Sequence, residues 1–379
     1  MTKPQRITIA ILSFIALSLA ATLGVYAYQS LWTVAQTPLG PVLPFMPTQT
    51  LPPTWTASPG QITAQVGQVT LAPTLALPTK PAGPLCGGPF LMNVLVIGAD
   101  ARADTYNYGL GDAIRLVRVD FVTPKVSALE FPRDLWVEIP HIADNLNGQD
   151  HEKLNQAYLY GQPVFKYWDD PSEGSGLTAL TLNKNFGVNI DHYITVNMRT
   201  FEHIIDAIGG IEVEIPNAEV AKTANLSIGK HQLNGAQALK LARNRSGGSF
   251  ERADNQNLVL CAVRKKLTNP QIITKVPEII QTFQSNIRTD LTPEQLGQLA
   301  CLAAQMPPEN IVLASFPGDL FKQTRVLDPV LEKRVAILDA DFDILSDFVA
   351  RFQAGTWPIP AAAETSPSIN DEDAASVCQ

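Results

Sequence analysis

The stretch FLMNVLVI at positions 90–97 decides the fold, because it is apolar, rich in β-branched residues and ended by Gly98. A short run of this kind predicts a buried central strand. Residues 114–121 bring an alternating apolar pattern, Thr-Pro-Lys follows at 123–125, and residues 126–131 are apolar again. This spacing predicts a β-hairpin next to the central strand.

Helices and further strands are expected after the hairpin. Apolar spacing predicts helices at 177–186, 200–208, 233–242 and 250–267, with short strands at 193–196 and 211–215. Asn234 and Gln237 have the spacing of a capping box at the start of the third helix. Strands mixed with helices, including a hairpin, predict an α/β fold: a three-layer αβα sandwich with a mixed central sheet.

The N-terminus has the pattern of a membrane anchor. Lys3 and Arg6 precede an uncharged apolar run at 7–28, which as a helix would be about 33 Å long and match a bilayer core of roughly 30 Å. A cleavable signal peptide is the alternative, with Val25-Tyr26-Ala27 as a cleavage site. The positive residues predict a single-pass cell-membrane protein with residues 1–6 in the cytoplasm and the rest outside.

Composition divides the rest of the chain. Residues 29–84 are dominated by Pro, Thr, Ala, Gly and Gln and predict an extracytoplasmic tether. We expect the catalytic domain at 85–270, a C-terminal helical or α/β extension packed on it at 271–356, and a disordered tail at 357–379. The net charge of -8 argues against nucleic acid as a partner.

Four cysteines, Cys86, Cys261, Cys301 and Cys378, permit three fully paired connectivities in an oxidising compartment. Cys261 and Cys301 both stand inside apolar helical patterns. A bridge between these two and a pair of buried free thiols are the alternatives.

Acidic residues gather where the first two strands meet. Asp100 and Arg102 follow the first strand, and Asp112 begins the second. Paired carboxylates at a sheet end suit a hydrated divalent cation, Mg²⁺ or Mn²⁺, so Asp100 and Asp112 are candidate metal ligands. Ordinary solvated loop residues are the alternative.

Arginines are concentrated at three further places. Arg133 follows a strand in Phe-Pro-Arg-Asp, Arg243 and Arg245 end a helix, and Arg252 shares a helical face with Asn255 and Gln256. Converging guanidinium groups bind phosphate oxygens in bidentate fashion and would fit a pyrophosphate. A local ion pair or a solvated helix face is the alternative.

Several separated motifs occur in the order of a known family. They are residues 93–100, Gly111-Asp112, Phe131-Pro132-Arg133-Asp134, residues 153–158, residues 233–245 and residues 252–256. Over roughly residues 90–266 the chain resembles the LytR-CpsA-Psr family.

The resemblance implies an enzyme that binds a polyprenyl-pyrophosphate-linked glycopolymer, with the lipid in an apolar tunnel, and transfers the glycopolymer phosphate to a peptidoglycan hydroxyl. It implies that Asp100 and Asp112 lie at the metal and that, with Arg133, they are the catalytic group. It also implies a set of pyrophosphate and head-group ligands: Arg102, Arg133, Lys153, Arg243, Arg245, Arg252 and Gln256.

The chain departs from the family pattern at three positions. Leu110 stands where the family has an arginine, Asn255 replaces the second arginine of an Arg-x-x-Arg-Gln pattern, and Ser249 replaces an acid. These changes keep two other functions open: hydrolysis of the lipid pyrophosphate, and a non-catalytic lipid-binding or regulatory role in the envelope.

Overall fold

The computed structural model describes residues 83–101, 106–244, 249–267, 286–328 and 332–358, together with Leu39 and Ile272. The predicted anchor at 7–28 and most of the predicted tether and tail lie outside these ranges, as do Arg102, Arg245 and Cys378. Within the described ranges, none of the helices has the length and apolar character needed to cross a bilayer.

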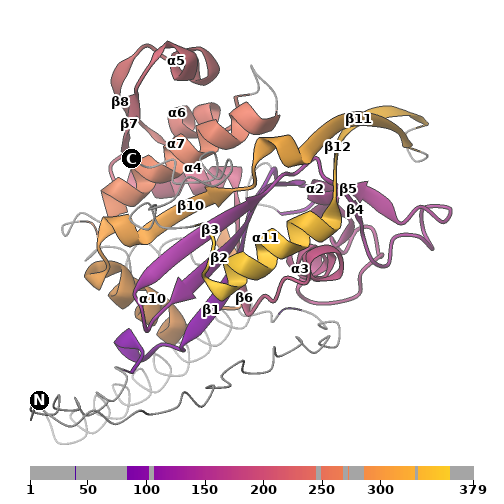
Figure 1. The fold of residues 1–379 in the computed structure, drawn as a ribbon, viewed down its shortest axis with the longest axis horizontal. Helices are drawn as coiled ribbons and strands as arrows, with labels where there is room; N and C mark the ends of the chain where they lie inside the picture. Colours follow the sequence, from indigo (N-terminus) through magenta and orange to yellow (C-terminus); the bar gives the residue numbers. More distant parts are fainter. Residues whose placement is uncertain are drawn as a thin grey trace, which may run out of the picture.

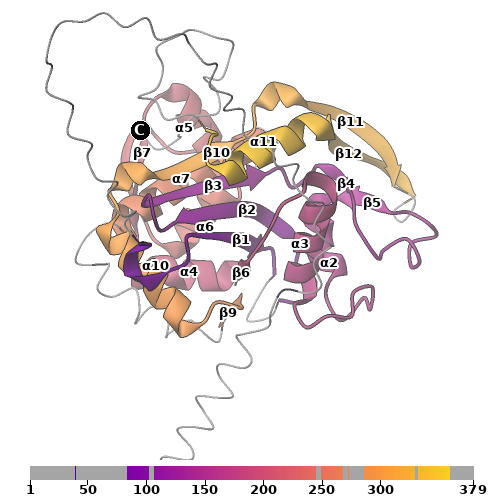
Figure 2. The ribbon, with the colours of Figure 1, turned by 60° about the horizontal axis from the view of Figure 1, so that its bottom comes forward.

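A six-stranded mixed sheet forms the centre of the molecule, in the order β10-β3-β2-β1-β6-β9. Figure 2 shows most of these strands side by side. β1 pairs antiparallel with β2 and parallel with β6, β3 pairs antiparallel with β2 and parallel with β10, and β9 is antiparallel to β6. The strands are β1 (Leu91–Ala99), β2 (Gly111–Asp120), β3 (Lys125–Phe131), β6 (His192–Asn197), β9 (Ile287–Thr289) and β10 (Ile311–Ser315). The predicted central strand and hairpin are confirmed.

Helices flank both faces of this sheet (Figure 1). On one face α2 (Leu154–Tyr160), α3 (Glu173–Phe186) and α11 (Phe342–Ala354) enclose the largest core. On the other face α10 (Pro293–Gln305) covers Met92 and Val94 of β1, and α7 (Ser249–Leu267) meets β2 through a hydrogen bond of 2.8 Å from Arg115 Nη2 to Asn257 Oδ1. Alternate residues of β1 therefore enter different cores, as the pleat requires.

A second core lies between α7 and a small excursion of the chain. The excursion contains α4 (Met198–Ala207), β7 (Ile211–Ile215), α5 (Ala218–Ala224), β8 (Gly229–Leu233) and α6 (Gly235–Ala242). Asn234 caps α6 in a capping box with Gln237, as predicted. This excursion delivers the C-terminal end of α6 to the sheet.

The segment predicted as a C-terminal extension supplies both edge strands, β9 and β10, of the central sheet. It also contains the hairpin of β11 (Phe321–Asp328) and β12 (Lys333–Ala340). The predicted tail is wrong at its start, since Trp357 is only 3% exposed and packs against Phe316 and Phe348. The remaining short elements are η1 (Leu85–Gly87), β4 (Trp136–Glu138), β5 (His151–Lys153), η3 (Pro308–Asn310) and η4 (Gly318–Leu320).

A disulfide joins Cys86 of η1 to Cys301 of α10, with their Cα atoms 5.9 Å apart. Cys261 is disulfide-bonded as well. Both sequence-based alternatives, a Cys261–Cys301 bridge and free thiols, are therefore wrong. The reason is tertiary: η1 packs on α10 and brings Cys86 to Cys301 from 215 residues away.

Candidate functional site

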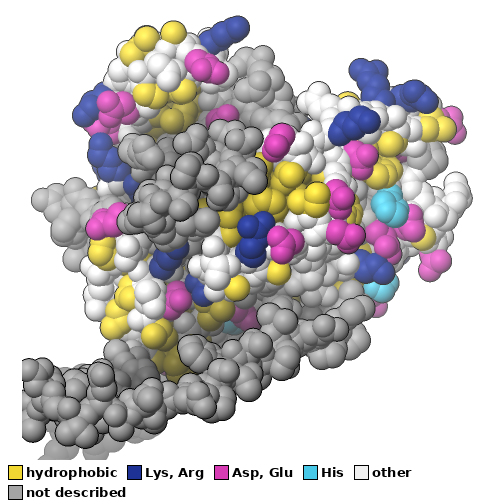
Figure 3. All heavy atoms as spheres, in the orientation of Figure 1, with side chains coloured by type: hydrophobic (Ala, Val, Ile, Leu, Met, Phe, Trp, Pro, Cys, Tyr) yellow, Lys and Arg dark blue, Asp and Glu magenta, His cyan; other side chains and the backbone are white. Residues whose placement is uncertain are grey.

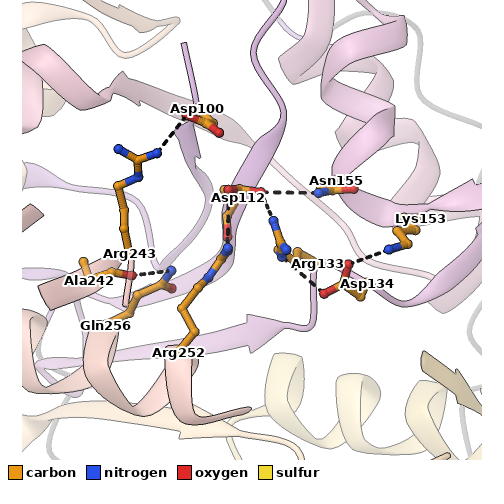
Figure 4. Close-up of polar contacts among 10 residues, drawn as sticks. All are labelled: Asp100, Asp112, Arg133, Asp134, Lys153, Asn155, Ala242, Arg243, Arg252 and Gln256. Atoms are coloured by element: carbon orange, nitrogen blue, oxygen red, sulfur yellow. Dashed lines mark hydrogen bonds and ion pairs between the residues drawn. The ribbon is translucent and has the colours of Figure 1, made fainter. Parts of the chain in front are cut away.

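The two predicted metal carboxylates lie at one end of the sheet. Ala99 pairs with Gly111, and the Asp100 amide donates to the Leu110 carbonyl at 2.8 Å. Asp100, just after β1, and Asp112, at the start of β2, therefore lie at the same end of two neighbouring strands. Gly98 pairs with Ala113 and Ala99 pairs with Gly111, so the register shifts between them and Asp112 is the extra residue of the bulge. Figure 4 shows both carboxylates between side chains that arrive from the two helical layers.

Asp112 is the centre of the cluster. Its Oδ1 accepts from Arg133 Nη1 at 2.6 Å and from Asn155 Nδ2 at 3.3 Å, and its Oδ2 lies 3.3 Å from Arg252 Nη1. Arg252 Nη2 also donates to the Asp112 main-chain carbonyl. Asp112 therefore connects β2 to β3, α2 and α7.

A second carboxylate, Asp134, continues this network on one side. Its two oxygens accept from Arg133 Nε at 3.2 Å and from Lys153 Nζ at 3.1 Å. Burial lowers the pKa of Arg133, but the charges of Asp112 and Asp134 outweigh it and the pKa is raised overall. We call Arg133, Asp134, Lys153 and Asn155 the β3–α2 side of the site.

The opposite side is less constrained. Arg243 ends α6, its side chain is 46% exposed, and its Nη2 lies 3.9 Å from Asp100 Oδ1. Asp100 Oδ1 and Gln256 Oε1 are buried, and neither has a hydrogen-bond partner within the described part of the chain. The Gln256 amide donates to the Ala242 carbonyl at 3.5 Å. We call Arg243, Arg252 and Gln256 the α6–α7 side of the site (Figure 4).

The structure thus brings together the predicted residues that it describes. They are Asp100, Asp112, Arg133, Lys153, Arg243, Arg252 and Gln256. Arg102 and Arg245 lie outside the described residues, so their predicted roles stay predictions. Sequence reasoning missed Asp134 and Asn155, although both stand inside motifs that carried the family resemblance.

The departure at Asn255 has a structural counterpart. Asn255 is 1% exposed, and its Nδ2 donates to the Thr223 carbonyl of α5 at 3.2 Å. It ties α7 to the excursion and brings no charge to the site. Leu110 contributes its carbonyl to Asp100 instead of a guanidinium group.

Asp100 and Asp112 have the ligand chemistry of a magnesium site in which substrate phosphate would complete the shell. The described residues contain no group of three or more His, Cys, Asp or Glu side chains that could hold a metal. Mg²⁺ commonly takes one or two carboxylates and completes its shell with water and substrate phosphate. Asp100 Oδ1 is buried and has no hydrogen-bond partner within the described part of the chain, so it is the atom best suited to bind such an ion.

Two cavities adjoin the cluster in the described part of the chain. One of about 40 Å³ lies beside Asp112 and is lined by Glu130, Arg133, Arg252 and Phe316 among others. A wider one of about 600 Å³ lies beside Arg243, and Leu226, Leu233, Leu239 and Leu241 contribute to its wall. On the face shown in Figure 3 basic and acidic side chains are interspersed over the described part of the chain.

Two curated relatives and one solved structure illustrate what the chain is similar to. It is 33% identical over 213 residues to the polyisoprenyl-teichoic acid–peptidoglycan teichoic acid transferase TagU of Oceanobacillus iheyensis, covering 55% of this chain and 61% of that one. It is 28% identical over 213 residues to the regulatory protein MsrR of Staphylococcus aureus, covering 55% and 58%. The chain thus spans about three fifths of the length of these relatives.

The crystal structure of TagV from B. subtilis has the same fold, with a TM-score of 0.52 and 21% identity over 70% of this chain and 97% of that one. The model of the LytR_cpsA_psr family matches residues 90–334, from the central strand β1 to the start of β12. Because this match covers most of the chain, the protein belongs to the LytR-CpsA-Psr family.

Proposed function

We propose that this protein is a phosphotransferase that moves a glycopolymer phosphate from a polyprenyl-pyrophosphate lipid to a peptidoglycan hydroxyl. The observation that carries the proposal is the convergence of Arg133, Arg252 and Arg243 on two adjacent carboxylates at the sheet end. The transferase name of the relative TagU supports the same reaction class.

The reaction exchanges one phosphorus–oxygen bond for another. The acceptor hydroxyl oxygen attacks the phosphorus that carries the glycopolymer, the bond to the bridging oxygen breaks, and polyprenyl monophosphate leaves. Negative charge grows on the bridging and equatorial oxygens, so the protein must neutralise charge and hold the reactants in line.

In this proposal Arg133 and Arg243 have different tasks. Arg133 is held at 2.6 Å by Asp112, so it orients that carboxylate and adds positive charge at a fixed place. Arg243 is half exposed and 3.9 Å from Asp100, so its planar fork is available to a phosphate. Arg243 is therefore the principal pyrophosphate ligand among the described arginines.

Asp100 and Asp112 would hold Mg²⁺ or Mn²⁺, which when bound would supply charge neutralisation on the pyrophosphate. Asp112 already accepts hydrogen bonds from Arg133 and Asn155 and pairs with Arg252. Among the described residues Asp100 has a single ion pair, at 3.9 Å, so its carboxylate is the better acceptor for the proton of the attacking hydroxyl. A cation bound to Asp100 would weaken this carboxylate as a base.

Anchoring in the membrane remains part of the proposal. Lys3 and Arg6 before the apolar run at 7–28 support an N-terminus in the cytoplasm and a domain outside it. A reporter fused after Gly60 should be active only outside the cytoplasm, and activity confined to the cytoplasm would overturn this topology.

The function is tested with a labelled polyprenyl-pyrophosphate glycan donor and the full chain, with and without peptidoglycan fragments. The proposal is supported if label becomes attached to the fragments and if little label is released from the donor when the fragments are omitted. Release of free glycan phosphate regardless of fragments would indicate a pyrophosphatase, and binding without turnover would indicate a regulatory role. Excess chelator should abolish turnover, and undiminished turnover in chelator would contradict the requirement for a divalent cation.

A further inference from the structure

An exposed aromatic residue lies in the loop that connects the two metal carboxylates. Tyr108 is 67% exposed, and its φ of 60° places it in the left-handed region, which is unfavourable for a bulky residue. Its neighbour Asn107 is exposed as well. Residues held in such conformations cluster at ligand sites, so Tyr108 needs a functional account.

Tyr108 packs against a cluster of other aromatic rings. Its ring meets the edge of Phe165 with centroids 6.3 Å apart, and Phe165 in turn contacts Tyr160 at 5.8 Å and Tyr167 at 5.7 Å. Tyr160 belongs to α2 and is buried in the main core. Val164, 47% exposed, precedes Phe165. We call Tyr108, Val164 and Phe165 the aromatic patch.

The aromatic patch adjoins the site. Tyr108 is two residues from Leu110, so the Cα atoms of these two residues are at most about 8 Å apart. The Leu110 carbonyl accepts from the Asp100 amide, which ties this part of the loop to Asp100. Phe165 follows α2, the helix that sends Asn155 to Asp112. The patch therefore lies on the α2 flank of the site, beyond the C-terminal end of that helix, whereas Arg243 and Arg252 come from α6 and α7.

We propose that the aromatic patch binds sugar rings of the acceptor glycan, an inference that rests on the proposed transferase function. In-line transfer requires the acceptor to approach opposite the leaving group. If Arg243 holds the pyrophosphate on the α6–α7 side, the acceptor enters from the other side, where the aromatic patch lies.

The chemistry of the patch favours a sugar over a lipid chain. A pyranose ring has apolar C–H faces that pack on aromatic rings, and hydroxyls that need polar neighbours. The phenol of Tyr108 and the exposed Asn107 and Lys166 provide such neighbours and interrupt the apolar surface. A polyprenyl chain would instead require a continuous apolar wall.

The test compares Tyr108→Ala with Phe90→Ala in the full chain. Phe90 is a matched control because it is 72% exposed and stands at the end of β1 opposite to Ala99, about 30 Å from Ala99 at 3.3 Å per residue. Tyr108→Phe keeps the ring and should keep most of the binding. Calorimetry with a soluble N-acetylhexosamine tetrasaccharide from peptidoglycan measures binding without any donor.

Tyr108→Ala should weaken tetrasaccharide binding and raise the acceptor KM about three- to tenfold, with unchanged donor affinity. Equal binding by the Tyr108→Ala and Phe90→Ala proteins would overturn the inference. Loss of affinity for phosphatidylglycerol vesicles, with tetrasaccharide binding intact, would assign the patch to a membrane and also overturn it. Because binding is measured without turnover, a failed transfer assay alone would affect the proposed function only.

Discussion

The two sides of the site differ in how firmly their cations are held. On the β3–α2 side, Arg133 and Lys153 each have a carboxylate partner between 2.6 and 3.2 Å away. On the α6–α7 side, Arg252 is buried and lies 3.3 Å from Asp112, but Arg243 is 46% exposed and 3.9 Å from Asp100. The difference indicates that the β3–α2 side, together with Arg252, is a scaffold that fixes Asp112, and that Arg243 on the α6–α7 side keeps capacity for a ligand.

The largest effect on stability is expected for Asp112→Ala, because Arg133 and Arg252 then lose a shared counter-ion. Breaking such a buried pair should cost about 3 kcal/mol of unfolding free energy. Asp100→Ala is the matched control and should cost less than about 1 kcal/mol, since its ion pair is long. Both variants should lose donor turnover. Denaturant unfolding distinguishes them, and equal losses of stability would contradict the difference between the sides.

Removing the disulfide shows what a purely structural lesion does to both sides. Cys86→Ser combined with Cys301→Ser opens a loop of 215 residues and should lower the unfolding free energy by about 2 to 4 kcal/mol. Donor affinity should not change, because η1 precedes β1 and the site follows it. A donor affinity that falls with the bridge would mean that the sheet end depends on α10.

Glu152, next to Lys153, makes the β3–α2 side sensitive to pH. Burial, then the charge of Asp328, raises the pKa of Glu152 to about 7 from 4.5, while Gln156 and Lys153 oppose the shift. The folded state binds this proton more tightly than the unfolded state, so stability falls as the pH rises from about 4.5 to 7.

Glu152→Gln should remove this part of the pH dependence. We expect it to match the parent at pH 5 and to exceed its unfolding free energy by about 1 to 3 kcal/mol at pH 7.5. Urea unfolding at the two pH values measures the difference. A constant offset between the two proteins would show that Glu152 does not titrate in this range.

Local patterns predicted the elements that carry their own signal. The strand at 90–97, the hairpin up to residue 131 and the capping box at Asn234 all form as expected. Asp100 and Asp112 could also be placed at one sheet end, because a strand must end before one and begin near the other.

What depends on distant pairing could not be predicted. β10 joins β3, and β9 joins β6, across long stretches of chain whose own pattern is short and ambiguous. Asn155 and Asp134 likewise became site residues only when the start of α2 bonded to the segment after β3, where the Asn155 amide donates to the Arg133 carbonyl at 3.0 Å. The same holds for Cys86, whose partner was set by the contact of η1 with α10.

The most direct measurement is the affinity of the full chain for a short prenyl pyrophosphate in the presence of Mg²⁺, by calorimetry, for Arg243→Ala. We expect a Kd about ten- to a hundredfold higher than that of the parent, with stability changed by less than about 1 kcal/mol. Arg243→Lys should also be impaired, because an ammonium group lacks the planar fork. Arg325→Ala, an exposed arginine of β11, is the control and should bind as the parent does. An unchanged Kd for Arg243→Ala would contradict the assignment of the α6–α7 side to the pyrophosphate.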